Sequence, residues 1–447
     1  MDTTLLACLA LISVLGLIIL RVPIAFALGS VASLGLFIFF SWRPGGTFEI
    51  QQGLTPTLSL LASTPYNFVH NYPLSMIPLF IGLGHVSFHA RITTDLFDAL
   101  RVYLVRIPGG LAMASILGCG GFSAITGSSV ACASAMGRIA VPEMLRFGYS
   151  PRLATGAVAS GGTLGSLIPP SLLFVIYAIF TEQSVKLLFM AGMLPGLISL
   201  SGYLVTTFIW ARVKPDDAPS SDVKFTRKDR IHAVSQTWPA GVLLLIVIGG
   251  IYLGIFTPTE AAAVSLSVAV LIGFLRGRLN WSTLVESLKE TVLQSAMIFM
   301  IAIGAKIFVS FVSLTRIAPI LLDTLQGSGV PFPVVILGVV ILYLALGMIL
   351  DSIGILVLTL PFTIPLIEGY GLNLIWFGVV VIKLLEIGLI TPPIGLNVFV
   401  IKSVSPSSVR LESIFQGVAW FLIIDFLVLA AIILFPSLSL MIPNAVM

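Results

Sequence analysis

The chain has 447 residues, of which 57% are hydrophobic and only 9% are charged. Because an ordinary soluble domain contains about 25% charged residues, this composition excludes a water-soluble globular protein and indicates a polytopic membrane protein. The net charge of +4 is explained by loop lysines and arginines that face the cytoplasm. The sequence contains no nucleic-acid-binding motif.

Apolar runs long enough to cross a bilayer follow one another along the chain. A span needs about 20 apolar residues, and we count about ten such runs. The first covers residues 5–20 and is read as a retained helix, because no clear cleavage site accompanies it; the last covers residues 415–435. The longest polar stretch, residues 211–237, predicts a cytoplasmic linker that divides the chain near its midpoint.

Landmark residues recur in the two halves at nearly constant spacing. The pairs that lie 223 residues apart are Pro108 and Pro331, Ser129 and Ser352, and Pro169 and Pro392. Gly148 and Gly369 lie 221 residues apart. Four matches in one order indicate a duplication, which is a common way to build transporters.

We therefore expect an all-α membrane protein with two repeats, residues 1–210 and 238–447. The predicted parts of the first repeat are scaffold helices 1–90, a re-entrant hairpin 108–147, a broken helix 152–180 and a helix 187–211. Those of the second are scaffold helices 238–312, a re-entrant hairpin 331–368, a broken helix 371–403 and a helix 414–435. Helices 187–211 and 414–435 are the last elements of the two repeats.

The positive charges predict the orientation of these repeats. When the spans are assigned in order, 18 of the 23 lysines and arginines fall on one side, Arg43, Lys186 and Arg316 fall on the other, and Lys306 and Lys383 lie within the membrane. The richer side marks the cytoplasm. Both termini then face outward, and the two repeats enter the membrane from opposite sides. Inverted repeats of this kind are typical of alternating-access transporters.

Glycines, adjacent prolines and hydroxyl side chains interrupt an apolar segment at residues 161–171, GGTLGSLIPPS. Unwound backbone is tolerated within a membrane only where it is buried in protein or lines a wet cavity. We expect the helix to stop near Gly162 and to restart after Pro170. The freed carbonyls and the hydroxyls suit a hard cation such as sodium, and the free N–H groups of the restarted helix suit an anion. LEIGLITPPIGLN, residues 385–397, repeats the pattern.

Two hairpins are predicted to face these breaks. Residues 109–122 and 130–147 flank the hydroxyl-rich FSAITGSSV, and residues 333–346 and 355–367 flank GMILDSIG. Asp351 in the second hairpin places a carboxylate near the middle of the membrane, where acids are functional candidates by default. The alternative is that the small residues at the tips only ease helix packing.

The other intramembrane charges leave alternatives open. Lys383 and Glu386 are three residues apart on one helix, so they can neutralise each other. Lys306 either attracts an anionic substrate or extends its ammonium group to the membrane surface. The amphipathic stretches 94–105 and 281–290 are expected to lie along the membrane interface.

Three long strings, residues 118–145, 149–171 and 386–400, resemble the large membrane subunit of tripartite ATP-independent periplasmic (TRAP) transporters. The resemblance covers nearly the whole chain. It implies an elevator-type, sodium-driven importer in the bacterial inner membrane that carries organic acid anions such as dicarboxylates or sialic acid. It also implies two partners, a small four-helix membrane subunit on a separate chain and a periplasmic substrate-binding protein. In such a membrane, the outward-facing termini predicted from the charge distribution would lie in the periplasm.

The resemblance also implies the site residues. One sodium site would contain Ser128, Ser129, Gly162, Gly165 and Pro169, and the other Gly347, Asp351, Ser352, Gly388, Thr391 and Pro392. The substrate would lie between them, near Thr126, Gly127, Ser171, Gly354, Asn397 and Lys306. Coupling to sodium is thus the only cofactor requirement that we expect.

Two other functions are alternatives. A stand-alone sodium and dicarboxylate symporter of related fold would need no binding protein. An intramembrane enzyme would need a catalytic motif such as GxSxG or HExxH, and the sequence has none. We therefore expect a transporter and not an enzyme.

Overall fold

The structure is a computed structural model, which describes residues 3–42, 48–219 and 225–446. Within these residues the secondary structure is helical, apart from one isolated β-bridge between Trp42 and Phe48. The predicted all-α class is thereby confirmed. Arg43 and Lys224, which entered the count of positive charges, lie outside the described residues.

The helices have the length and composition of membrane spans. Among the described residues, eight helices are long and apolar enough to cross a bilayer, and nine if the bent pair Tyr72–His89 and Ile92–Leu104 forms one span. The sequence predicted about ten membrane-spanning runs. The difference arises because some apolar runs fold as shorter helices. The run 5–20, for example, lies almost entirely in α1 (Thr3–Ile19), which has 17 residues.

The chain forms two compact units, and each unit takes residues from both halves of the sequence. Unit 1 is drawn from Met1–Ser75, Leu293–Leu342 and Ile353–Leu374. Its elements are α1, α2 (Ile24–Ser41), α3 (Ile50–Val69), a 3-10 turn (Tyr72–Ser75), the later part of α15 (Trp281–Thr315), α16 (Ile317–Gly327), and most of α17 (Phe332–Gly347) and α18 (Ser352–Gly369).

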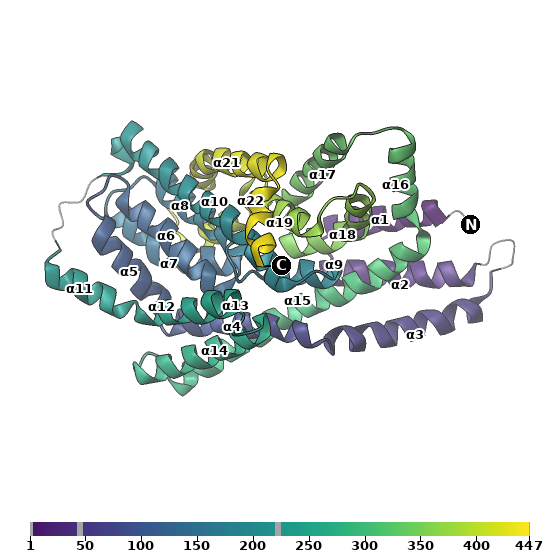
Figure 1. Cartoon of the computed structure of the whole chain (residues 1–447), viewed down its shortest axis with the longest axis horizontal. Coiled ribbons are helices and arrows are strands. Elements are labelled where there is room, and N and C mark those ends of the chain that lie inside the picture. Colours follow the sequence, from purple (N-terminus) through teal and green to yellow (C-terminus); the bar gives the residue numbers. More distant parts are fainter. Residues whose placement is uncertain (1–2, 43–47, 220–224, 447) are drawn as a thin grey trace. The chain divides into compact units, whose positions relative to one another are not determined.

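Small residues allow close helix packing in unit 1. A Cβ atom on Gly304 of α15 would lie 2.5 Å from the Ala25 carbonyl oxygen of α2, and one on Gly35 would lie 2.5 Å from the Phe311 ring. Such close approach is typical of helices that pack within membranes. Figure 1 shows α2 and α3 side by side, and these helices are also in contact.

Unit 2 is drawn from Met76–Val292, Tyr343–Ser352 and Ile375–Met447 and contains all the remaining helices. Those before the midpoint are α4 (Met76–His89), α5 (Ile92–Leu104), α6 (Gly110–Thr126), α7 (Ser129–Arg146), α8 (Pro151–Leu167), α9 (Leu172–Thr181) and α10 (Val185–Val213). Those after it are α11 (Arg227–Gln236), α12 (Trp238–Leu244), a π-turn (Leu245–Gly249), α13 (Gly250–Tyr252), α14 (Pro258–Leu275), the start of α15, α19 (Leu374–Ile390), α20 (Leu396–Val404), α21 (Leu411–Leu434) and α22 (Ser437–Val446).

Helix α8 lies at the centre of unit 2. It packs against α6, α7, α10, α20 and α21, and all its residues from Leu153 to Leu167 are buried. Figure 1 shows α6, α7 and α8 next to one another. A Cβ atom on Gly417 of α21 would lie 2.0 Å from the Arg152 carbonyl oxygen, so glycine permits the contact with α21. The broken segment of the first half therefore forms the core of the unit.

The two stretches that were predicted to lie at the membrane interface are parts of longer helices. Residues 94–105 lie almost entirely within α5, whereas residues 281–290 are the beginning of α15, a continuous helix of 35 residues. The linker region 211–237 includes α11, whose first turn is fixed by a capping box between Thr226 and Asp229. Such a box satisfies backbone donors at a helix start.

Candidate functional site

The first helix break lies later than the sequence suggested. Helix α8 continues through Gly162 and ends at Leu167, and α9 begins at Leu172. The prediction of a stop near Gly162 was wrong, because a glycine inside a helix costs only about 1 kcal/mol. A proline is more disruptive, since it disfavours helix at the residue before it. Pro169 therefore sets the end of α8.

Two glycines of α8 serve close packing against the first hairpin. A Cβ atom on Gly162 would lie 2.8 Å from the Ala133 Cβ, and one on Gly165 would lie 2.8 Å from the Ser128 carbonyl group and 2.9 Å from the Ser129 nitrogen. Only glycine fits at such distances. The hairpin thus lies directly on the last turns of α8.

The tip of the first hairpin meets the break. Gly127 ends α6 with a φ of 65°, and its carbonyl oxygen accepts a 3.0 Å hydrogen bond from the Leu172 backbone nitrogen at the start of α9. A Cβ atom on Gly127 would lie 2.4 Å from the Pro170 carbonyl oxygen. The prediction that the hydroxyl-rich tip and the proline break come together is confirmed here.

Hydroxyl and carbonyl oxygens converge beside this tip. Ser129 Oγ donates to the Thr163 carbonyl oxygen at 3.2 Å and lies 2.5 Å from Ser166 Oγ. All three residues are buried. Sequence reasoning included Ser129 but missed Thr163 and Ser166, although both belong to the quoted GGTLGSLIPPS. Their position on the helix that faces the tip was the signal that could have found them.

Other predicted sodium and substrate residues near the first break have local structural partners. Ser128 caps α7 by accepting a bond from the Ala131 nitrogen, and Ser171 caps α9 through the Phe174 nitrogen. Thr126 Oγ1 donates to the Phe122 carbonyl within α6. The expected free N–H groups at the start of α9 are therefore already engaged at Leu172 and Phe174.

The second break has a related arrangement. Helix α19 ends at Ile390, residues 391–395 are not helical, and α20 begins at Leu396. Gly347 at the end of α17 touches Gly388 of α19, where a Cβ atom on Gly388 would lie 2.7 Å from the Gly347 Cα. The end of the first arm of the second hairpin therefore contacts α19 just before its break.

Polar groups of the second site differ in their surroundings. Asp351 is half-buried in the tip, whereas Ser352 is buried and its Oγ has no hydrogen-bond partner among the described residues. Thr391 Oγ1 donates to the Ile387 carbonyl at 2.6 Å, and Pro392 is exposed. The second break is thus more open than the first, in which Ile168 to Ser171 are all buried.

The predicted substrate residues do not all fall in one unit. Asn397 of α20 is buried in unit 2, and its Nδ2 donates to the Ala159 carbonyl of α8 at 3.4 Å. Gly354 and Lys306 belong to unit 1, where Gly354 is buried and Lys306 is half-buried. Asn397 therefore links the second broken helix to the first.

The predicted pair Lys383 and Glu386 is confirmed, and it belongs to a larger buried cluster. Lys383 Nζ lies 3.3 Å from Glu386 Oε2 and 2.6 Å from Asp425 Oδ1, and it donates to Ser199 Oγ at 3.1 Å. Tyr203 also donates to Asp425 Oδ1, at 2.5 Å. Lys383, Glu386 and Asp425 are at most 1% exposed, so this lysine is held by protein groups.

Asp425 is the main functional candidate that sequence reasoning missed. It interrupts α21, which is otherwise apolar through its middle, and an acid within a membrane span is a functional candidate by default. That rule was applied to Asp351 but not to Asp425. The pairing with Lys383 depends on contacts between separate helices and could not be seen in the local pattern.

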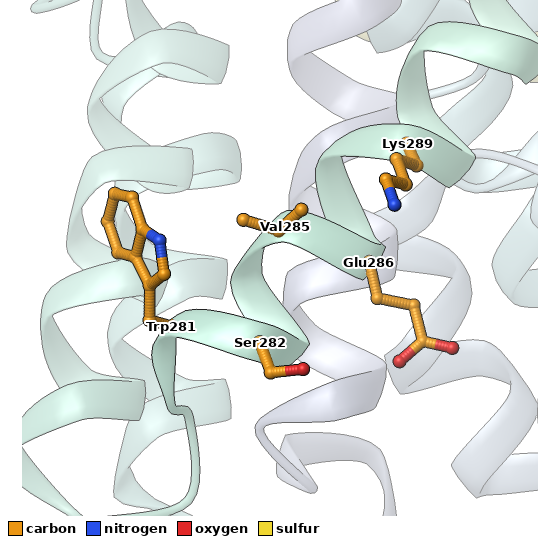
Figure 2. A pocket seen from close by; sticks show the side chains of 5 residues that line it. All are labelled: Trp281, Ser282, Val285, Glu286 and Lys289. Atoms are coloured by element: carbon orange, nitrogen blue, oxygen red, sulfur yellow. The ribbon is translucent and has the colours of Figure 1, made fainter.

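A cavity of about 630 Å³ lies elsewhere, at the start of α15. It is lined by Trp281, Ser282, Val285, Glu286 and Lys289, all from a single helix, as Figure 2 shows. Trp281 is 74% exposed, and tryptophan is enriched where a span meets water. The interfacial position of residues 281–290 stays a prediction, and the cavity is lined by none of the predicted site residues.

Comparison with known proteins gives consistent matches along the chain. The family described as "Tripartite ATP-independent periplasmic transporter, DctM component" matches residues 11–438. The sialic acid TRAP transporter large permease protein SiaM of Vibrio cholerae is 30% identical over 432 residues, which cover 96% of each chain. The C4-dicarboxylate TRAP transporter large permease protein DctM of Pseudomonas aeruginosa is 33% identical over 88% of this chain and 93% of its own.

Solved structures show the same fold at low sequence identity. The YdaH transporter of Alcanivorax borkumensis aligns with a TM-score of 0.62 at 15% identity, covering 100% of this chain and 99% of its own. MtrF of Neisseria gonorrhoeae aligns with a TM-score of 0.61 at 13% identity, covering 96% and 95%. The chain therefore shares the overall fold of these two proteins.

Proposed function

Since the chain belongs to the tripartite ATP-independent periplasmic transporter family as its DctM component, we propose that it is the large membrane subunit of a sodium-driven importer of an organic acid anion. The SiaM relative is a sialic acid transporter protein and the DctM relative a C4-dicarboxylate transporter protein. Both substrates bear a carboxylate at neutral pH. We therefore propose a carboxylate anion as the cargo of this chain.

One observation carries the sodium proposal: a hairpin meets a broken helix in each half. At the first break, Ser129 Oγ, Ser166 Oγ and the Thr163 carbonyl converge among buried residues. Sodium is a hard cation that prefers such oxygen ligands, and unwound segments of transporters supply them. At the second break, Asp351, the Ser352 hydroxyl and the backbone around Thr391 would supply a second set, since Gly347 just before the tip contacts Gly388 just before the break.

The anion fits best beside the second break. Helix α20 begins at Leu396 without a side-chain cap, so its positive N-terminal end is open to an anion. Asn397 lies in its first turn, and its Oδ1 has no partner among the described residues. Its Nδ2 already donates to the Ala159 carbonyl, so the backbone N–H groups at the start of α20 would be the donors to a carboxylate.

In the mechanism that we propose, sodium first orders the hairpin tips against the broken helices and thereby completes the anion site. The loaded hairpins and broken helices then cross the membrane together, as in an elevator. A small four-helix membrane subunit and a periplasmic binding protein would complete the importer in the bacterial inner membrane. Both termini of the large subunit would lie in the periplasm.

Uptake by reconstituted vesicles tests this function. The chain, the small subunit and the binding protein are reconstituted, and the uptake of radiolabelled sialic acid and succinate is measured with and without an inward sodium gradient. We expect one of the two anions to accumulate only with the gradient and with the binding protein present. Uptake that is indifferent to sodium would contradict the coupling, and uptake by the chain alone would indicate a stand-alone symporter.

Single substitutions test the two sodium sites separately. We expect Ser129→Ala and Asp351→Ala each to raise the sodium concentration that gives half-maximal uptake, because each removes an oxygen ligand. The matched control is Ser201→Ala, which alters an exposed serine that bonds only to its own helix. A sodium dependence equal to that of the wild type in either variant would exclude that residue from the site.

A further inference from the structure

A chain of hydrogen bonds leads from the buried charges to the first hairpin tip. Asp425 Oδ1 accepts hydrogen bonds from Lys383 and Tyr203. The Tyr203 hydroxyl also lies 3.2 Å from Thr163 Oγ1, and the carbonyl oxygen of Thr163 accepts the bond from Ser129. Four helices and the hairpin are thus joined through residues that are no more than 4% exposed, and the last link is made by the backbone carbonyl of Thr163.

The protons along this series of hydrogen bonds have a defined order. A phenol has a single proton, and that of Tyr203 points to the Asp425 carboxylate, which can only accept when ionised. The tyrosine oxygen is then an acceptor toward Thr163, whose own proton is shared between Tyr203 and the Ser160 carbonyl. Hydrogen bonds to charged groups are stronger than neutral ones. The carboxylate, held by Lys383, therefore fixes the tyrosine, and the tyrosine fixes the threonine.

Thr163 is the residue at which this series of hydrogen bonds reaches the proposed ion site. Its side chain faces Tyr203 of α10, while its carbonyl faces Ser129 at the hairpin. A rotation or shift of this last part of α8 would move the carbonyl relative to the Ser129 and Ser166 hydroxyls. Cation sites lose affinity when their ligands are misplaced by fractions of an ångström.

We propose that Tyr203 is a positioning residue for the first sodium site, which it fixes by anchoring Thr163 to the Lys383 and Asp425 pair. This inference rests on the proposed sodium coupling and adds a residue that does not touch the ion. It also gives the buried charges a role: they form the rigid end of the chain of hydrogen bonds. The prediction is that removing the Tyr203 hydroxyl weakens sodium binding although no ion ligand is lost.

The test is the sodium dependence of thermal unfolding of the purified chain, with choline chloride holding the ionic strength constant. A ligand that binds the native state raises the unfolding midpoint to an extent set by its affinity. We expect Tyr203→Phe and Thr163→Val to raise the half-saturating sodium concentration roughly threefold to tenfold, the equivalent of one hydrogen bond. Thr163→Ser keeps the hydroxyl and should bind sodium as the wild type does.

Tyr252→Phe is the matched control. This tyrosine also has a part-buried hydroxyl, which donates to the Phe189 carbonyl at 3.2 Å and takes no part in the chain to Ser129. Tyr252→Phe should lower the unfolding midpoint that is measured in the absence of sodium. It should leave the half-saturating sodium concentration unchanged. The same pattern in Tyr203→Phe and Thr163→Val would overturn the positioning role alone. If the wild type shows no sodium effect, the sodium coupling falls and the positioning role falls with it.

Discussion

Gly388→Ala is expected to abolish uptake, because it separates the second hairpin from its broken helix. The added methyl group would lie 2.7 Å from the Gly347 Cα and 3.1 Å from the Gly347 carbonyl atoms. Both neighbours are backbone, so no rotamer change can relieve the overlap. Overpacking typically costs about 1–3 kcal/mol, and here that cost is relieved only by moving the end of α17 at Gly347 away from Gly388 of α19.

Gly338→Ala is the control for this effect. Gly338 lies on α17, the same helix as Gly347, is exposed, and has no atoms within 4 Å of the position that a methyl group would take. Alanine should stabilise the helix there by about 0.5–1 kcal/mol relative to glycine. Uptake and thermal unfolding are measured for both variants. Normal uptake by Gly388→Ala would show that the contact between the hairpin and α19 is dispensable.

Lys383→Met is expected to destabilise unit 2 by about 3–5 kcal/mol, the usual cost of removing one partner from a buried ion pair. Asp425 and Glu386 would remain buried without their cation, and both already have one carboxylate oxygen without a hydrogen-bond partner among the described residues. The measurement is the unfolding midpoint in detergent micelles. Lys289→Met, at an exposed position, should change stability by no more than about 0.5 kcal/mol.

A second substitution separates lost charge balance from lost packing. Replacing a buried ion pair by apolar groups of similar volume is often close to neutral. Lys383→Met combined with Asp425→Leu should therefore be less destabilised than Lys383→Met alone. If the losses of unfolding free energy from the two substitutions are additive, the ionic contact between α19 and α21 does not contribute the stability that we assign to it.

The sequence allowed the breaks and tips to be predicted because their causes are local. Pro169 and Pro392 interrupt helices through their own covalent structure, and the tip at Gly127 follows from a glycine between hydroxyl residues. The end of α8 was placed too early, since Gly162 was read as a helix breaker. Its actual role, contact with Ala133, depends on tertiary packing that no local pattern reports.

The buried cluster around Lys383, in contrast, could be predicted only in part, because most of its contacts are long-range. Lys383 and Glu386 could be paired from their spacing on one helix, but Asp425 lies 42 positions from Lys383 in the sequence. Tyr203 and Ser199 come from α10, on the other side of the linker. Only the packing of α10, α19 and α21 brings these groups together. Long-range polar contacts were therefore missed, although the unusual aspartate in an apolar helix could have suggested one.

The relation between the repeats stays a prediction. The spacing of Ser129 and Ser352 and of Pro169 and Pro392 indicates a duplication, and each half has a hairpin and a broken helix in the same order. Their opposite orientation in the membrane follows from the charge distribution, and cysteine labelling from each side of the membrane would test it.

Equilibrium binding of radioactive sodium to the purified chain tests most directly whether the two breaks hold ions. We expect saturable binding in the wild type, partial loss in Ser129→Ala and in Asp351→Ala, and complete loss when both substitutions are combined. Binding that does not saturate in the wild type, or that survives both substitutions, would contradict the assignment of sodium to the two breaks.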